Sequence, residues 1–174
     1  MSLYGVTFKD QLVPCLDDGA MQQKLFADGI VRGCAMSASG SVLTIGRGVI
    51  MAAGRLIGND ADLAVSVSST SGYARITLVI DLTGTATTEA FTQVSIRVDT
   101  ANSQSGFAAL TQEDINGGVD TRYEVALAIV SCSASGITIA SLLDSVQYAL
   151  IKSGTSVPTT DDISPGEIYL KYEA

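Results

Sequence analysis

The sequence contains no histidine and no tryptophan, and its 174 residues include only three prolines and three cysteines. Without histidine, the chain lacks the commonest general base and the commonest metal ligand of proteins. A Ser-His-Asp or Cys-His catalytic arrangement therefore cannot form, and no Gly-x-Ser-x-Gly motif is present to position a nucleophilic serine. We expect a protein that is not an enzyme and that holds no cofactor and no metal ion.

Basic residues are also scarce. Ten Lys and Arg oppose 18 Asp and Glu, which gives a formal net charge of −8. This balance argues against nucleic-acid binding, which needs a basic surface, and against attraction to anionic lipid. No apolar run approaches the roughly 20 residues that cross a bilayer, so we expect no membrane insertion. The first ten residues carry no signal-peptide pattern, which predicts synthesis and retention in a cytoplasm.

Hydrophobic residues make up 47% of the chain and charged residues 16%, a composition that excludes disorder because burial can offset the entropy of ordering. The length suits a single domain, which at this size buries roughly two thirds of its unfolded surface. Cys34 and Cys132 lie in apolar runs, and the chain has no C-x-x-C spacing. We therefore predict buried hydrophobic cysteines rather than a zinc or redox site.

Short apolar segments separated by Gly, Ser and Thr predict an all-β fold, an antiparallel β-sandwich or barrel-like domain. Apolar and polar residues alternate over Leu63–Ser68, Tyr73–Leu82 and Gln93–Asp99. This alternation is typical of half-buried strands that are solvated on one face. Ile30–Met36 and Val42–Ile45 flank Ser39-Gly40, a pattern that predicts a β-hairpin.

The segment Tyr123–Cys132 differs because both of its faces are apolar. Its pattern places three large residues on one side and three others opposite, namely Val125, Leu127 and Ile129 against Ala126, Ala128 and Val130. Such a strand is central and covered on both faces, either within the fold or by a neighbouring subunit. The sequence leaves these two alternatives open.

Helical signals are few. The best is Asp18–Ala27, with Asp17 or Asp18 as the N-cap and Gly29 just past the end. Gly19 lowers the stability of such a helix by about 1 kcal/mol relative to alanine. The sequence thus divides into an N-terminal arm with a short helix (1–27), a β domain (28–152), and a linker with a C-terminal strand or arm (153–174).

Ser141–Ile151 fits the spacing of either a helix or a strand, and the surrounding β pattern favours a turn followed by a strand. Ile168–Tyr172, near the end of the chain, is predicted to be a last short strand or an arm.

The stretch Thr111–Asp120 is the most polar candidate site. Its side chains imitate a calcium loop in part, through Asp114, Asn116, Asp120 and Glu124. An EF-hand requires glycine where Val119 stands and glutamate where Val125 stands. We favour a short helical turn, capped by the Thr111 hydroxyl and closed by Gly117-Gly118, and keep a weak calcium site as the alternative.

Three pairs of carboxylates have the residue types that a glycosidase uses, namely Asp17-Asp18, Asp60/Asp62 and Asp161-Asp162. All lie in polar, turn-like contexts, which favours solvated turn residues. Gly46-Arg47-Gly48 followed by Gly54 has neither the spacing of a dinucleotide-binding loop nor that of a phosphate-binding loop. Glycines inside strand segments instead predict β-bulges.

Two longer stretches resemble a known group of proteins. The first runs DGIVRGC over Asp28–Cys34, then IGRGVIM over Ile45–Met51 and GRLI over Gly54–Ile57. The second is LTQEDINGG over Leu110–Gly118, followed by the strand Tyr123–Val130. In this order they resemble structural proteins from the tail, baseplate and head-fibre genes of phages and prophages of Gram-positive bacteria.

The resemblance implies a virion component made in the bacterial cytoplasm, which forms a homo-oligomer, often a trimer, and attaches fibres or contacts the host surface. Its implied partners are copies of itself, other virion proteins and, as an optional further partner, a host-surface glycan. The shared residues are scaffold residues, so no catalytic or binding residue is carried over. Many relatives continue into a long receptor-binding region, whereas this chain stops at Ala174, which favours a short fibre, adaptor or decoration role.

The alternative is a stand-alone module that binds a carbohydrate or another ligand of the bacterial surface. It predicts a monomer with an aromatic or calcium-dependent site. Aromatic residues are 6% of the chain and include no tryptophan, which argues against this alternative.

Overall fold

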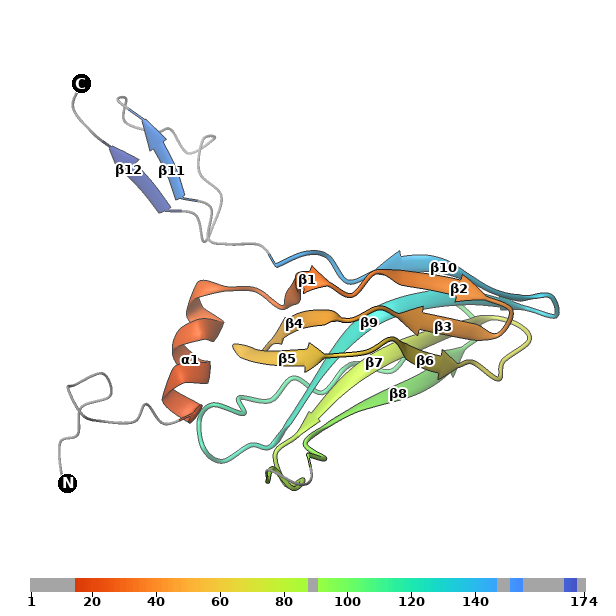
Figure 1. The fold of residues 1–174 in the computed structure, drawn as a ribbon, viewed down its shortest axis with the longest axis horizontal. Helices are drawn as coiled ribbons and strands as arrows, with labels where there is room; N and C mark the ends of the chain where they lie inside the picture. Colours follow the sequence, from red (N-terminus) through yellow and green to blue (C-terminus); the bar gives the residue numbers. More distant parts are fainter. Residues whose placement is uncertain (1–14, 88–90, 147–150, 155–167, 172–174) are drawn as a thin grey trace.

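The computed structural model describes residues 15–87, 91–146, 151–154 and 168–171 (Figure 1). Apart from one short helix, α1 (Cys15–Leu25), the regular structure of these residues is all strand, which confirms the predicted all-β class. The strands are β1 (Gly29–Gly33), β2 (Met36–Ser39), β3 (Val42–Ile45), β4 (Gly48–Ala52), β5 (Arg55–Asn59), β6 (Leu63–Ser66), β7 (Tyr73–Asp81), β8 (Val94–Ala101), β9 (Arg122–Ser133), β10 (Gly136–Leu142), β11 (Ile151–Gly154) and β12 (Ile168–Lys171).

The strands form a two-layered sandwich (Figure 1). One layer is a four-stranded antiparallel sheet in the order β10-β9-β7-β8. The other layer contains two three-stranded antiparallel sheets placed end to end, β1-β4-β5 and β2-β3-β6. The core between the layers includes the fully buried side chains Leu43, Ile76, Leu127 and Val130. Alternation of apolar residues along each strand supplies this inner face.

Two tight hairpins connect the strands of the second layer. The predicted hairpin at Ser39-Gly40 is confirmed, with Gly40 at a φ of 56° between β2 and β3. The turn between β4 and β5 places Ala53 at a φ of 48° and Gly54 at 73°. Two positive φ values in a two-residue turn match the right-handed twist of the strands, but alanine is strained there.

β7 is buried on both faces, which corrects the prediction of a strand solvated on one side. Its outward residues Arg75, Thr77 and Val79 are 7%, 0% and 5% exposed. The long connection from β8 to β9 covers this outer face. Ala108 lies in that connection, and its carbonyl accepts a hydrogen bond from Arg75 Nη1 at 2.8 Å. A distant segment therefore covers a face that its local sequence pattern marks as solvated.

β9 lies between β7 and β10, so both of its edges and its inner face are covered within the fold. A β-bulge at Leu127 shifts its register, because Ile76 pairs with Ala128 while Thr77 pairs with Ala126. The bulge changes the alternation that the sequence predicts. Val130 joins the core beside Leu127, whereas Ile129 does not.

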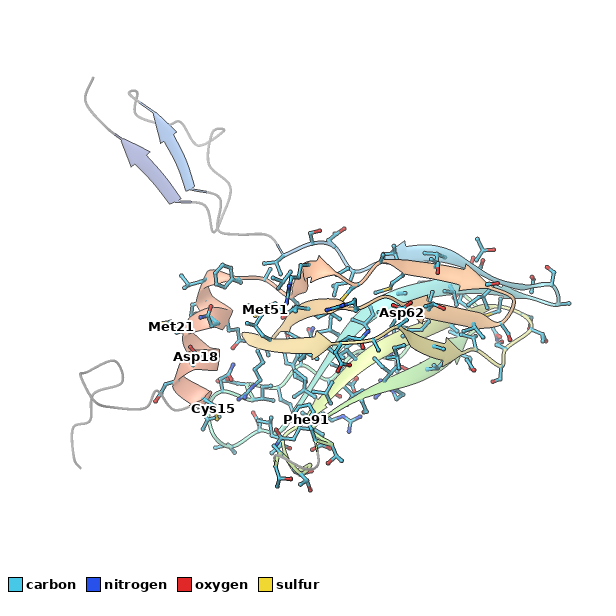
Figure 2. The ribbon with its side chains drawn as sticks, in the orientation of Figure 1. Cys15, Asp18, Met21, Met51, Asp62 and Phe91 are labelled. Atoms are coloured by element: carbon cyan, nitrogen blue, oxygen red, sulfur yellow. The ribbon has the colours of Figure 1, made fainter. Side chains whose placement is uncertain are left out.

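The helix begins at Cys15, three residues before the predicted start, and ends at Leu25. Asp17 and Asp18 lie in its first turn rather than at the N-cap, and there they interact favourably with the helix dipole. Figure 2 shows Cys15, Asp18 and Met21 along α1. A Cβ atom at Gly19 would lie 2.4 Å from Oδ1 of Asn116, so a larger residue there would displace the Asn116 side chain.

The segment Ser141–Ile151 begins as a strand, because Ser141 and Leu142 are the last residues of β10. The sequence pattern did not predict β10. Residues 147–150 lie outside the described part of the chain. The chain then passes from one layer to the other. Leu143 N donates to the carbonyl of Leu127, and Ile30 N donates to that of Asp144 at 2.8 Å. This crossing closes one side of the sandwich.

Near the C-terminus, β12 pairs with β11 in parallel, which confirms a short strand within the predicted range Ile168–Tyr172.

Cys34 and Cys132 are buried as predicted, with exposed fractions of 1% and 9%. Burial raises the pKa of the Cys34 thiol. Among the described residues, no helix has the length and apolar character needed to cross a bilayer.

Candidate functional site

Three segments of the chain run through both sheets of the second layer, and each is interrupted where one sheet meets the other. The interruption falls between β1 and β2, between β3 and β4, and between β5 and β6. Hydrogen bonds continue through it, since Cys34 N donates to the Arg47 carbonyl and Gly46 N to the Ala35 carbonyl. Asn59 Nδ2 adds hydrogen bonds at 3.3 Å to the carbonyls of Ile45 and Gly46. The break is thus a hydrogen-bonded bend in the layer.

Two glycines make this bend possible. A Cβ atom on Gly48 would lie 2.4 Å from the Arg32 carbonyl oxygen and from Cys34 N. Gly33 has a φ of 64°, and its Cβ would lie 2.3 Å from the Arg47 carbonyl oxygen. Both positions therefore require glycine. Gly58, in the edge strand β5, is different, because a Cβ atom there would meet nothing within 4 Å.

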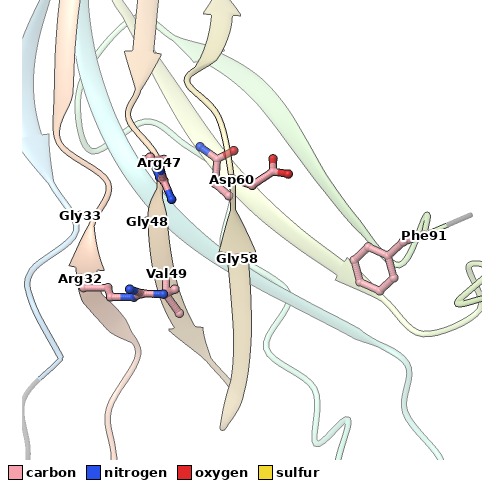
Figure 3. Close-up of a pocket in the computed structure, with 9 residues that line it drawn as sticks. Arg32, Gly33, Arg47, Gly48, Val49, Gly58, Asp60 and Phe91 are labelled. Carbon is pink, nitrogen blue, oxygen red and sulfur yellow. The ribbon is translucent and has the colours of Figure 1, made fainter. Parts of the chain in front are cut away.

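A groove with a volume of about 830 Å³ lies over this bend (Figure 3). Arg32 of β1, Val49 of β4 and Gly58 of β5 are register partners across three neighbouring strands. Figure 3 shows Arg32 extended along the sheet toward Val49, with Gly58 in the next strand. The remaining lining residues are Gly33, Arg47, Gly48, Asn59, Asp60 and Phe91.

The groove contains two cations, Arg32 and Arg47. Arg75, Arg97 and Arg122 form ion pairs with carboxylates elsewhere in the chain. In the described residues, no carboxylate lies within ion-pair distance of the guanidinium of Arg32 or Arg47, and both residues are exposed. Arg47 is held instead by its backbone, whose N–H donates to Asp62 Oδ1 at 3.3 Å.

An aromatic ring lines the same groove. Phe91, in the connection between β7 and β8, is 62% exposed (Figures 2 and 3). Asp60 is also exposed and lies beside Asn59 at the end of β5. The groove therefore combines two cations, one carboxylate, one amide and one aromatic ring over a glycine-containing floor.

The other charged cluster, on the outer face of the four-stranded sheet, is fully paired. The Glu124 side chain is 3% exposed and accepts hydrogen bonds from Arg97 Nη1 at 2.5 Å and Nη2 at 3.0 Å. Arg122 Nε donates to it at 3.0 Å and the backbone N–H of Thr111 at 3.2 Å. The hydrogen bonds from Arg97 are the main reason that the pKa of Glu124 falls to about 2.

Asp99 extends this cluster toward β7. It accepts hydrogen bonds from Arg97 Nε at 2.8 Å and from Arg75 Nη2 at 3.1 Å. Burial acts to raise the pKa of Asp99, but the two arginines outweigh it and the pKa is lowered. Arg97 bonds both carboxylates, and Arg122 and Arg75 add a second arginine to Glu124 and Asp99, so this cluster ties the β8–β9 connection to the sheet and offers no free charge for chemistry.

The stretches 28–57 and 110–130 contact each other. Asp28 Oδ2 accepts a hydrogen bond from the Tyr123 hydroxyl at 2.9 Å, and its Oδ1 accepts one from Ala53 N at 2.8 Å. Asn116 donates to the Ala53 carbonyl at 2.8 Å and accepts from Arg55 Nη2 at 3.0 Å. These motif residues thus hold the strained β4–β5 turn.

Replacing Tyr123 by phenylalanine is expected to lower the free energy of unfolding by about 1.5 kcal/mol, because it removes a hydrogen bond to the charged Asp28. Burial, reinforced by Asp28, raises the pKa of Tyr123 to about 12, so the hydroxyl is a donor throughout the physiological range. Urea unfolding measures the difference. The control is Tyr73→Phe, since the Tyr73 hydroxyl has no hydrogen bond among the described residues; equal losses in both variants would contradict the assignment.

The structure separates the residues of the proposed calcium loop. Asn116 is directed to α1, where its Nδ2 donates to Gln23 Oε1 at 3.0 Å, and Glu124 lies in the arginine cluster. The segment forms a hydrogen-bonded turn at Ile115–Gly118, and Gly118 closes it at a φ of 79°, which agrees with the predicted turn. The Thr111 cap was not the arrangement found, because the Thr111 backbone pairs with Glu124. Within the described ranges, no three His, Cys, Asp or Glu side chains gather closely enough to hold a metal ion.

The structure describes two of the three predicted carboxylate pairs. Asp17 and Asp18 lie on α1, and Asp161-Asp162 lies outside the described residues. Asp60 faces the groove, whereas Asp62 accepts a hydrogen bond from the Arg47 backbone N–H.

The groove itself was not predicted, although Arg32 and Arg47 lie in the quoted stretches. The sequence feature that could have indicated the groove is Gly58, a glycine inside a strand with no turn beside it.

Comparison with known proteins gives no family for the chain. No protein-family model matches the sequence, and no curated protein is significantly similar to it.

Proposed function

We propose that this chain is a non-enzymatic structural module of a phage particle, a fibre, baseplate or adaptor component that works as a homo-oligomer. The sequence resemblance supports this proposal, and one observation on the molecule carries it: one side of the sandwich is open. The edges of β5 and β6 on one layer and of β8 on the other have no strand partner among the described residues.

An apolar cleft of about 320 Å³ reaches from this open side into the core. Its lining includes Leu63 and Val94 at the two edges and the core residues Leu78 and Leu127. Leu56 and Leu63, both in the β5–β6 edge, are 66% and 39% exposed. Lysine and proline commonly protect such edges in monomeric proteins, and β5, β6 and β8 contain neither. The charged residues of these strands are Arg55, Arg97 and Asp99, and each is hydrogen-bonded within the fold. A second copy of this chain is the partner that we propose for this side.

The solution mass, measured by size-exclusion chromatography with light scattering, tests this proposal. We expect a multiple of 18.0 kDa, with a trimer as the form that the resemblance favours. The double variant Leu56→Lys with Leu63→Lys is expected to shift the mass to that of a monomer, because it places charges on both exposed apolar positions of the edge. Both side chains are solvent-accessible, so folding should be retained.

Val119→Lys is the matched control, since Val119 is 86% exposed and lies in the β8–β9 connection rather than in the β5–β6 edge. It should leave the mass unchanged. A wild-type monomer at high protein concentration, or a double variant that remains oligomeric, would contradict the assembly through this edge.

The groove favours a second candidate function, a stand-alone module that binds a ligand of the bacterial surface. Two arginines that have no ion pair among the described residues line this groove together with an exposed aromatic ring, and these are features of a binding site rather than of a scaffold. A monomer that still binds a surface polymer would favour this candidate over the virion module.

A further inference from the structure

We propose that the groove over the bend binds an anionic saccharide, with Arg32 and Arg47 holding its acidic group. This site goes beyond the proposed assembly and does not depend on it, because binding can be measured on whichever species the chain forms.

The charges of the groove give the first argument. The protein carries a net charge of −8, yet two of its arginines stand in one groove without a carboxylate partner in the described part of the chain. Arginine presents a planar fork of donors that fits the two oxygens of a carboxylate or phosphate. Arg32 extends along the floor of the groove (Figure 3), so its guanidinium is already close to the surface on which a ligand would lie.

Gly58 gives the second argument. Glycine inside a strand weakens it, and such a residue often marks the close approach of a ligand or of another backbone. Packing explains Gly33 and Gly48, but it does not explain Gly58, where a side chain would enter open space. Because Gly58 is in register with Val49 and Arg32, a side chain there would project into the groove beside the arginine.

The remaining lining indicates a saccharide rather than a bare anion. Phe91 is 62% exposed, and an aromatic face can stack on the apolar face of a sugar ring. The Asp60 carboxylate would repel a second acid group but can accept hydrogen bonds from sugar hydroxyls. The groove volume of about 830 Å³ lies within the range of about 300–1,000 Å³ that is typical of ligand pockets.

Isothermal titration calorimetry at low ionic strength tests the site with defined probes. These are trigalacturonate, a phosphorylated galactotriose, uncharged galactotriose and inorganic phosphate. We expect one of the two anionic saccharides to bind, which identifies the acidic group as a carboxylate or a phosphate. Galactotriose and inorganic phosphate should bind at least about tenfold more weakly. Added salt should weaken binding, since it screens exposed charges.

Three variants locate the site. Arg32→Ala and Arg47→Ala should each reduce affinity at least about tenfold, the loss expected for a charged hydrogen bond. Gly58→Val should reduce it similarly without lowering the melting temperature, because valine favours strands and has free space there. Lys24→Ala on α1 removes an exposed cation outside the groove and should leave affinity unchanged.

Three results would overturn the proposal. One is the absence of binding by both anionic saccharides, and another is inorganic phosphate binding as tightly as either saccharide. The third is an equal loss of affinity in Lys24→Ala and the arginine variants, which would indicate non-specific attraction. The light-scattering mass of the same samples reports on assembly separately, so failure of the site and failure of the oligomer remain distinguishable.

Discussion

Replacing Glu124 by glutamine is expected to lower the free energy of unfolding by about 3 kcal/mol, a large fraction of the stability of a domain of this size. The side chain is 3% exposed and is surrounded by donors from Arg97, Arg122 and the Thr111 backbone. Glutamine keeps the volume but removes the charge, and its amide group would face another donor. We place the cost at the low end for a broken buried ion pair because the two arginine side chains are 35% and 40% exposed.

The same carboxylate predicts how stability depends on pH. Its pKa in the folded protein is about 2, below the ordinary value of 4.5, so folding favours the ionised form. Its contribution is therefore complete above the unfolded pKa and is lost as pH falls from about 5 toward 2. The lowered pKa values of Asp99 and Asp81 act in the same direction.

Urea unfolding of the wild type and of Glu124→Gln between pH 7 and pH 2 measures both effects. The difference between the two proteins should be largest near neutral pH and should shrink in acid. Asp120→Asn, at an exposed position that accepts no hydrogen bond among the described residues, is the control for loss of one charge. A constant difference across the pH range would contradict the assignment to Glu124.

Gly48→Ala is expected to lower the free energy of unfolding by about 3 kcal/mol, whereas Gly58→Ala should leave it unchanged or raise it. The added methyl group at Gly48 would lie 2.4 Å from backbone atoms of Arg32 and Cys34 and 2.6 Å from the Cys34 sulfur. Backbone atoms held in a sheet cannot turn aside, so β1 and β4 would separate locally. At Gly58 the same methyl group meets nothing within 4 Å.

This pair of variants applies one chemical change to two neighbouring strands of a single sheet. Thermal unfolding followed by circular dichroism compares them directly. If both variants lost stability to the same degree, intrinsic strand preference rather than close packing at the bend would explain the loss, and the role assigned to Gly48 would be wrong.

The sequence predicted those parts of the fold that depend on local patterns. Alternation placed β7 and β8 almost to the residue, and Ser39-Gly40 identified a hairpin because its turn chemistry is local. The same alternation gave the wrong environment for Arg75 and Thr77. Their burial depends on a connection that begins more than twenty residues later, and a local pattern does not contain that information.

The groove was beyond the same kind of reasoning. Arg32, Asp60 and Phe91 come from three separate parts of the chain, and only the bend and the hairpin register bring them together. Glu124 illustrates the converse. Its position in a polar stretch suggested a calcium ligand, but strand pairing places it against Arg97. The spacing along the sequence identified residues that could bind a metal ion, but it did not identify the residues that they contact in the fold.

The crossing that closes one side of the sandwich also determines how the domain would respond to tension. β1 and the residue Ser145 form a parallel bridge, with hydrogen bonds from Ile30 N to the Asp144 carbonyl and from Val146 N to the Ile30 carbonyl. Pulling the domain by residues 29 and 146 would load these bonds together in shear, so they would have to break at once rather than one after the other. Resistance to such a pull is governed by the rate of unfolding. The resistance of this crossing to such a pull is therefore expected to depend on these two hydrogen bonds.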